Sequence, residues 1–339
     1  MKMHKSLFFI VVVLVSLASF SQSIKGNIKD SKTNEPIEGA SVYFDNTTIG
    51  DISNMEGDFE IPFNESINTS LVISFLGYKK QVVAEYDPSK SINIKLIEDV
   101  STLNEVVIDS RDTWSRKKKL EQFKMQFLGF SDNSLSCKIL NEEDIYLRYL
   151  ENENMLVAST KKPIRIRNKN LGYNIEYDLQ EFEIQYEISS GSLKINTVSS
   201  VFYSGTTYYK SDKVSNKILK KRRNTYYGSS LHFMRSLLYD KLEENKFSLL
   251  YEKNEISAEN FISKYATNES SIYQVRIFKP LVIVYDKNVA RQSSITPNQD
   301  YFYLDLNGGY SPIEAITFTG EMGTKRFGDT LPLDYKPDK

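Results

Sequence analysis

Short runs of alternating apolar and polar residues fill the first part of the chain. They lie at residues 24–28, 40–44, 58–61, 71–75, 81–84 and 92–96. Polar clusters such as residues 30–34 and 45–48 separate these runs, and such clusters are typical of turns. Because no helical period interrupts the runs, the pattern predicts a small β-sandwich.

The pattern changes after a polar stretch at residues 99–113. Within residues 116–130, one face carries Leu120, Phe123, Phe127 and Phe130, which predicts an amphipathic helix with its lysines in water. Two further helices are expected at residues 230–242 and 258–264. Strand patterns occupy most of the remainder, at residues 144–150, 155–159, 163–167, 173–189, 202–205, 272–278, 281–285, 301–306 and 314–319. The fold class is therefore predicted as mainly β, α+β, with a β-sandwich followed by a β-rich domain with a few helices.

Three local features add detail to this prediction. The alternation slips between Leu179 and Phe182, which predicts a β-bulge. The segment Asn307-Gly308-Gly309 predicts a hairpin turn between the last two strands. Residues 135–139 alternate around Cys137, which is expected to be a small buried side chain on a strand, with an intermolecular disulfide as the alternative.

The first 21 residues have the features of an export signal. Lys2 and Lys5 precede an apolar run at residues 7–17, and Ser19 and Ser21 offer small residues before a cleavage site. The run is shorter than the roughly 20 apolar residues that cross a bilayer, although a retained anchor is the alternative. No cysteine follows the run directly, which argues against lipoprotein processing at this site. The sequence thus predicts an exported protein of the periplasm or outer membrane.

Histidine and cysteine are scarce in this chain. It has two histidines and one cysteine among 339 residues, and cleavage after residue 21 would leave only His232. Zinc sites need three or four ligands drawn mostly from these residue types, so none is expected. No calcium-loop motif occurs either, although a site made only of carboxylates stays possible. We therefore predict no metal, no cofactor and no intramolecular disulfide.

A basic segment at residues 217–235 contains the candidate contact residues. A solvated loop is the default interpretation of this segment, and a structural role that of its histidine. The candidates for contact with a partner or an anion are Arg222, Arg223, His232 and Arg235. Ser229 near His232 suggests a hydrolase, but the segment has no G-x-S-x-G motif, and Ser229 is better interpreted as an N-cap. Without residues 1–21, 41 basic and 44 acidic residues remain, a net charge of −3. Nucleic acid is therefore not expected as a partner.

Five motifs occur in order in the first part of the chain. They are Ile24-Lys25-Gly26-Asn27-Ile28-Lys29-Asp30, Glu35-Pro36-Ile37-Glu38-Gly39-Ala40-Ser41-Val42, Gly57-Asp58-Phe59, Ser74-Phe75-Leu76-Gly77-Tyr78 and Leu103-Asn104-Glu105-Val106-Val107. Together they resemble the carboxypeptidase regulatory-like domain of Bacteroidota envelope proteins, a transthyretin-like sandwich. Ser53-Asn54 departs from the Thr-Asp usual in that family. The resemblance covers about residues 22–108 and implies an accessory domain without zinc ligands.

The same domain precedes the plug of many TonB-dependent receptors. About 230 residues follow Val107, fewer than a plug and a large barrel need. The length therefore predicts no barrel, despite the resemblance to the receptors' first domain. Segments of the second part, such as residues 170–173 and 331–335, resemble barrel-less Bacteroidota envelope proteins known by their first domain. That resemblance implies no activity and no functional residue.

These observations predict four segments and a non-enzymatic envelope function. The segments are a signal peptide at 1–21, the regulatory-like sandwich at 22–98, a linker at 99–113 and a β-rich domain at 114–339. The expected role is docking, scaffolding, or binding of an envelope protein or glycan. One alternative is a hydrolase that uses paired carboxylates. The other is a peripheral outer-membrane protein held by the helix at 116–130.

Overall fold

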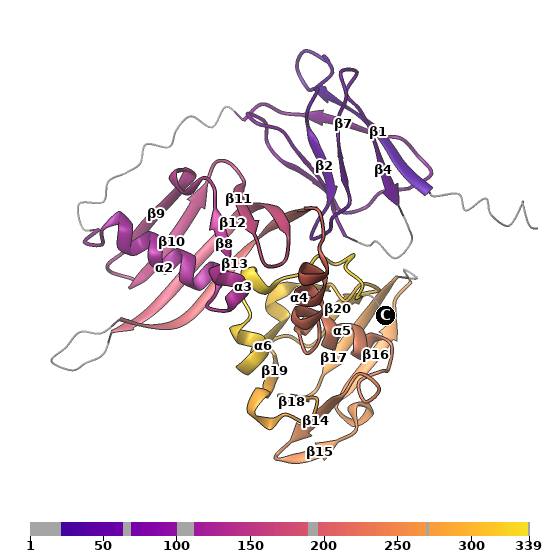
Figure 1. Cartoon of the computed structure of the whole chain (residues 1–339). Helices are drawn as coiled ribbons and strands as arrows, with labels where there is room; N and C mark the ends of the chain where they lie inside the picture. Colours follow the sequence, from indigo (N-terminus) through magenta and orange to yellow (C-terminus); the bar gives the residue numbers. More distant parts are fainter. Residues whose placement is uncertain (1–21, 64–68, 100–111, 189–195, 269–270, 338–339) are drawn as a thin grey trace, which may run out of the picture.

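The computed structural model of the chain describes residues 22–63, 69–99, 112–188, 196–268 and 271–337 (Figure 1). The predicted signal peptide and most of the predicted linker lie outside these residues. The described chain consists mostly of strands in several sheets, with a few short helices, so the mainly β, α+β prediction is confirmed. Its helices are too short or too polar to cross a membrane. The domain boundaries stay a prediction.

Buried apolar side chains of the described residues gather in three large clusters. The sandwich core lies within residues 24–96, the middle core within residues 114–209 plus Phe327, and the C-terminal core within residues 233–322. We call the parts of the chain around these clusters the sandwich, the middle unit and the C-terminal unit. Figure 1 shows the sandwich above the other two units, with the end of β13 (Asn196–Ser211) reaching toward it.

The sandwich consists of two small sheets of strand order β4-β1-β7 and β3-β2-β5-β6. Alternation along β1 buries Ile24 and Ile28 in the sandwich core and leaves Lys25 and Lys29 exposed. The strands are β1 (Gln22–Asp30), β2 (Ser41–Phe44), β3 (Gly50–Ile52), β4 (Asp58–Phe63), β5 (Leu71–Ser74), β6 (Gln81–Val83) and β7 (Ile92–Leu96). The predicted sandwich is confirmed. Only β3 was not predicted, because its one apolar side chain, Ile52, follows Gly50 and Asp51 and is 55% exposed, so no alternation marks it.

A long hairpin of β12 (Tyr173–Ile188) and β13 organises the middle unit. On the other side of β12 the sheet continues through β10 and β11, in the order β8-β11-β12-β10-β9. The register shift between Leu179 and Glu181 confirms the predicted bulge. The other strands are β8 (Cys137–Ile139), β9 (Ile145–Leu150), β10 (Met155–Thr160) and β11 (Ile164–Asn168), and the helices are α2 (Arg116–Leu128) and α3 (Asp132–Leu135).

Helix α2 packs its apolar face into the middle core. Phe123 and Phe127 are fully buried there. The prediction was wrong about the end of this helix, because Gly129 takes a φ of 101° after Leu128 and leaves Phe130 59% exposed. A membrane-bound helix would need the face that already packs on the sheet, so this geometry disfavours α2 as an anchor.

The C-terminal unit contains two sheets and three helices within its described residues. The sheet orders are β15-β14-β18-β19-β22 and β16-β17-β20-β21. The strands are β14 (Phe247–Tyr251), β15 (Asn254–Ile256), β16 (Ile262–Ala266), β17 (Ile272–Ile277), β18 (Leu281–Tyr285), β19 (Ser293–Pro297), β20 (Phe302–Asp305), β21 (Tyr310–Ser311) and β22 (Ile316–Thr319). The helices are α4 (Asn216–Tyr226), α5 (Ser230–Leu238) and α6 (Gly320–Thr324).

Four local predictions for the C-terminal unit are corrected. The helix expected at 258–264 is a 3-10 turn followed by strand β16, which pairs with β17. Helix α5 ends at Leu238, where Lys264 donates to the last carbonyls and Asp240 takes a positive φ. The turn at 307–309 joins β20 to β21, and β22 pairs with β19 instead. The basic segment expected as a loop includes helix α4, capped by Ser215.

Cys137 lies on a strand but is only half-buried. The strand begins at Cys137, and Leu135 ends helix α3 with 77% exposure, so the longer strand predicted at 135–139 is wrong. Burial raises the pKa of the Cys137 thiol to about 12. A thiol that stays protonated is a poor nucleophile, so Cys137 acts here as a small packing residue.

Truncation of Phe127 to alanine is expected to destabilise the chain strongly. The ring stacks on Phe123 and Phe327 with centroids 5.2 and 4.7 Å away, so its loss leaves a cavity in the middle core. We expect Phe127→Ala to lower the free energy of unfolding by about 3–5 kcal/mol. The matched control Phe130→Ala removes an exposed ring and should cost under about 0.5 kcal/mol. Urea denaturation measures both, and equal losses would contradict this account of α2.

Candidate functional site

The turn after β2 pairs with the outer edge of β13 and so joins the sandwich to the middle unit. The amide of Asn46 donates to the carbonyl of Thr207 at 2.8 Å, and the amide of Tyr209 donates to the carbonyl of Thr47 at 3.0 Å. The Asp45 carboxylate accepts the Thr207 amide at 2.7 Å. We call this set of contacts the junction. It satisfies backbone groups that an edge strand would otherwise leave open.

Side chains close the junction beside these backbone bonds. Tyr43 stacks on Tyr208 with ring centroids 4.8 Å apart, and both rings are buried. Gly50 permits this contact, since a Cβ there would lie 2.8 Å from the Tyr208 ring. Lys80 of the sandwich pairs with Asp178 of β12 at 3.0 Å, and both side chains are largely buried. The junction therefore combines packing, hydrogen bonds and a shielded ion pair.

The C-terminal tail connects the junction to helix α5. The amide of Leu333 donates to the Asn46 carbonyl at 2.7 Å, and Asp334 accepts bonds from Thr48. The guanidinium of Arg235 donates to three carbonyl oxygens, those of Asn307, Leu333 and Tyr335, at 2.7–2.8 Å. The planar fork of arginine suits such a convergent set of acceptors. One side chain thus holds the tail against the loop after β20.

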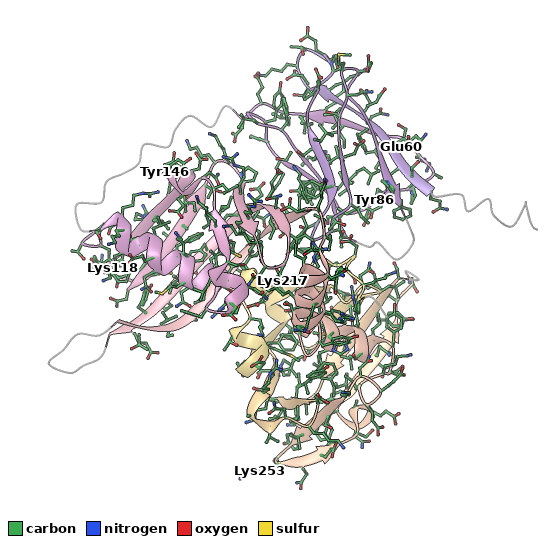
Figure 2. All side chains as sticks on the ribbon, viewed as in Figure 1. Glu60, Tyr86, Lys118, Tyr146, Lys217 and Lys253 are labelled. Atoms are coloured by element: carbon green, nitrogen blue, oxygen red, sulfur yellow. The ribbon has the colours of Figure 1, made fainter. Side chains whose placement is uncertain are left out.

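The predicted contact residues lie on helices α4 and α5. Arg222 is buried, donates to the carbonyls of Leu171 and Gly172, and lies 3.8 Å over the Tyr173 ring. Arg223 is half-buried on the same helix, while Lys217 lies at its exposed start (Figure 2). A partner or anion contact by Arg222, Arg223, His232 and Arg235 stays a prediction. For Arg222 and Arg235 it would compete with these internal bonds.

His232 is a buried hydrogen-bond acceptor. Its Nδ1 accepts the amide of Gly228 at 3.2 Å, and aromatic rings including Tyr226 and Phe247 surround it at 4.8–4.9 Å. Burial, aided by the Arg235 charge, lowers the pKa of His232 to about 4, so the ring is neutral near pH 7. Ser229 accepts the His232 amide as the predicted N-cap. Through these contacts, His232 and Ser229 stabilise the start of helix α5.

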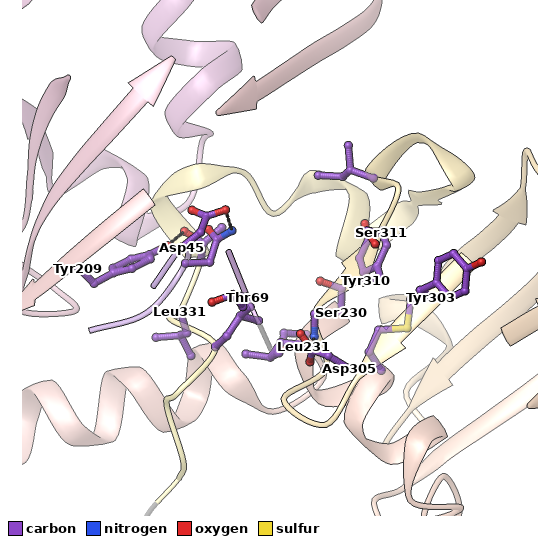
Figure 3. Close-up of a pocket in the computed structure, with 18 of the residues that line it drawn as sticks. Asp45, Thr69, Tyr209, Ser230, Leu231, Tyr303, Asp305, Tyr310, Ser311 and Leu331 are labelled. Atoms are coloured by element: carbon purple, nitrogen blue, oxygen red, sulfur yellow. Dashed lines mark hydrogen bonds between the residues drawn. The ribbon is translucent and has the colours of Figure 1, made fainter. Parts of the chain in front are cut away.

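A cavity of about 430 Å³ lies where the three units meet, a size common for small-ligand sites (Figure 3). The sandwich, β13, the start of α5, the β20–β21 hairpin and the tail all contribute to its wall. Figure 3 shows Asp45 and Tyr209 at one end and Tyr303 and Asp305 toward the other. Labelled side chains on its wall include Asp45, Thr69, Tyr209, Ser230, Tyr303 and Asp305.

Two carboxylates on the cavity wall, those of the buried Asp305 and the half-buried Asp45, accept hydrogen bonds from backbone amides. Asp305 Oδ1 accepts the amides of Asn307 and Gly309 at 2.8 and 2.9 Å, while Asp45 accepts the Thr207 amide. Burial outweighs these bonds and raises the pKa of each carboxyl to about 6. The two acids lie apart in Figure 3, so they do not form a facing pair of the kind a glycosidase uses.

Two further polar atoms of cavity-lining residues have no hydrogen-bond partner among the described residues. These buried atoms are Asp329 Oδ2 and Thr69 Oγ1. Asp329 is 7% exposed, and its other oxygen accepts a bond from Asn133 at 2.9 Å. Buried polar groups are normally paired, and these two atoms are exceptions that lie beneath the cavity surface. No cluster of His, Cys, Asp or Glu in the described part of the chain is suited to hold a metal ion.

Sequence reasoning missed the cavity residues. The sequence indicated Asp45 as part of a turn and Asp305 as part of the strand at 301–306, but their separation along the chain hid that both segments border one cavity. Asp329 and Thr69 gave no signal, since neither lies in a motif. The tail at 331–335 was noted only as part of a resemblance, not as the segment that Arg235 holds.

The pKa of His232 predicts a pH-dependent contribution to stability. Its folded value of about 4 lies below the ordinary 6.5, so this contribution is present above pH 6.5 and is lost as pH falls toward 4. His232→Asn keeps an acceptor for Gly228 and cannot titrate. The variant should be less stable than the parent near pH 7, and the gap should shrink by roughly 1–3 kcal/mol near pH 4.

Urea denaturation across this pH range measures the gap. Asp45 and Asp305 have raised pKa values, so each favours stability at low pH and loses that contribution as pH rises from 3.8 to about 6. Both acids are present in parent and variant, and their effects cancel in the comparison. A gap that widens on acidification would contradict the assignment of His232 as a neutral acceptor.

Comparisons with known proteins concern the sandwich. Residues 24–108 match the family described as CarboxypepD_reg-like domain. A stretch of 104 residues is 35% identical to the TonB-dependent receptor SusC of Bacteroides thetaiotaomicron and covers 30% of this chain. The match covers 10% of the receptor, so this chain corresponds to a small part of that relative's length. Residues 24–108 thus carry a CarboxypepD_reg-like domain, whose described part folds as the two-sheet sandwich.

Proposed function

We propose that the chain is a non-enzymatic, exported envelope protein in which the regulatory-like sandwich docks on a partner while the cavity between the three units binds a ligand. Its relation to part of a TonB-dependent receptor supports an envelope location. The family match supports a docking rather than a catalytic role for the sandwich. The cavity supports ligand binding by the whole chain, because all three units contribute to its wall.

The junction is the observation that carries this proposal. A domain tied only by a linker would turn freely, and its partner would have no set position relative to the cavity. Here the turn after β2, the Tyr43–Tyr208 stack and the tail hold the sandwich against β13. A partner bound to the sandwich would therefore be presented to the cavity in one orientation, which is the geometry a scaffold needs.

Two exposed apolar side chains offer a docking surface on the sandwich. Leu76 is 73% exposed and Ile97 is 54% exposed. Their segments are adjacent, because the Lys79 amide donates to the Ile97 carbonyl and Tyr78 bridges Glu98. Single exposed apolar residues are common, but two on neighbouring segments form a patch of the kind that protein interfaces bury. We call Leu76 and Ile97 the docking patch.

The cavity geometry favours binding over hydrolysis. A glycosidase of the usual kind needs two carboxyl groups that face each other across the scissile bond. Asp45 and Asp305 lie apart, and each is bonded to backbone amides that hold it in a turn. His232 is neutral and accepts a backbone amide, which leaves it poorly placed as a general base. These contacts support a structural role for the titratable groups.

Substitution of the docking patch tests the proposal. Leu76→Asp places a charge on the patch and should weaken co-sedimentation of the whole chain with isolated cell envelopes by about tenfold or more, since a buried unpaired charge is costly. Leu135→Asp is the matched control, because Leu135 is 77% exposed in the middle unit. Equal binding by both variants and the parent, or no envelope binding at all, would refute the docking role.

A further inference from the structure

Two exposed tyrosines, Tyr265 and Tyr303, lie on one face of the β16–β17–β20 sheet, and Tyr301, just before β20, has its ring centroid 5.5 Å from that of Tyr303. Register places Tyr265 of β16 opposite Gln274 of β17, and Gln274 opposite Tyr303 of β20. Their backbones are thus two strand spacings apart, roughly 10 Å. Tyr265 is 66% exposed, Tyr301 43% and Tyr303 38%. The opposite face is buried, where Val275, Phe302 and Leu304 enter the C-terminal core.

Polar groups accompany these rings on the same face. Gln274 lies half-buried between Tyr265 and Tyr303 in the register, and its amide has both donors and an acceptor. Arg276, two residues along β17, pairs with Asp300 at 3.8 Å in an exposed ion pair. Because the charges balance, this face has no strong field of one sign. Flat rings beside balanced donors and acceptors suit a neutral polyhydroxylated ligand.

The tyrosine face continues into the cavity. Tyr303 belongs to both, and Asp305, two residues along β20, also lines the cavity wall opposite Ile272 of β17. Figure 3 shows Tyr303 at the end of the cavity remote from Asp45 and Tyr209. Tyr265, on β16, lies at the end of this sheet face that is remote from the cavity. The path from the cavity across Tyr303 and Gln274 to Tyr265 is therefore continuous along one sheet face.

The cavity supplies the complementary chemistry for one end of such a ligand. Its wall includes residues with hydroxyl groups, such as Ser230 and Ser311, and the carboxylate of Asp305. Lys325 and Arg326 bring donors to the same wall. Sugar hydroxyl groups both donate and accept hydrogen bonds, so they match a wall of mixed donors and acceptors, and the apolar faces of sugar rings match the exposed tyrosine rings beside it. The mixed wall and the exposed rings together favour a carbohydrate.

We propose that the chain binds a neutral oligosaccharide, with one end in the cavity and the next units stacked along Tyr303 and Tyr265. The inference rests on the proposed function and names its ligand class. Stacking on exposed rings tolerates different sugars, so the rings would set affinity. The cavity, with its fixed acids and bases, would set which chain end is accepted.

Calorimetric titration of the whole chain with a panel of neutral hexasaccharides built from glucose, mannose, galactose or xylose tests the inference. At least one should bind, and Tyr265→Ala or Tyr303→Ala should each weaken its binding by about three- to tenfold. The matched control Tyr146→Ala removes a 40% exposed ring on β9, in the middle unit (Figure 2), and should leave binding unchanged.

Three results would overturn the inference. They are no binding to any hexasaccharide, equal binding by all three variants and the parent, and self-association of the parent that Tyr265→Ala abolishes. The last result would assign the face to a second copy of the chain. A negative result in the sugar titration would not contradict the docking role of the sandwich, because the envelope assay depends on Leu76 and not on the tyrosine face.

Discussion

Pairing of the turn after β2 with the outer edge of β13 is the constraint on which the arrangement of the chain depends. Two backbone hydrogen bonds and the Asp45 carboxylate join the strands of different units. An open edge strand would be costly or prone to aggregate, and the sandwich turn covers this part of it. The Tyr43–Tyr208 stack excludes water beside these bonds and makes them harder to exchange for solvent.

The tail extends the same constraint to the C-terminal unit. It bonds to the sandwich through Leu333 and Asp334, and to α5 through Arg235. The cavity is a consequence of this arrangement, since its wall is made of the surfaces that the junction and the tail bring close without complete contact. A ligand there would touch all three units. Ligand binding and the position of the sandwich are therefore expected to be linked.

Much of the fold could be predicted from the sequence, because alternation reports burial on one face of a strand. The sandwich strands, the bulge near Leu179 and the N-cap at Ser229 follow from local pattern. Helix α4 could not be predicted, because its basic residues show no apolar stripe and Arg222 is buried by bonds to distant carbonyls. The helix predicted at residues 258–264 was wrong for a related reason, because pairing of β16 with β17 decides the conformation of this segment.

The candidate site was beyond prediction because tertiary contacts alone define it. In the sequence, Asp45 is an ordinary turn residue, Asp305 belongs to a predicted strand and Asp329 lies in no motif, and only the tertiary contacts bring their segments to one cavity. The tyrosine face was hidden by a similar ambiguity. Alternation along β20 shows that Phe302 and Tyr303 point in opposite directions, but not which of the two faces is covered.

The most direct test of the central claim is a distance measurement between the sandwich and the C-terminal unit. Spin labels at Met55→Cys and Glu259→Cys, both exposed sites, in a Cys137→Ser background would report it by double electron–electron resonance. The junction predicts one narrow distance distribution in the parent. It also predicts a broad distribution in Gly50→Val, whose side chain would collide with Tyr208. A broad distribution in the parent itself would contradict a fixed junction.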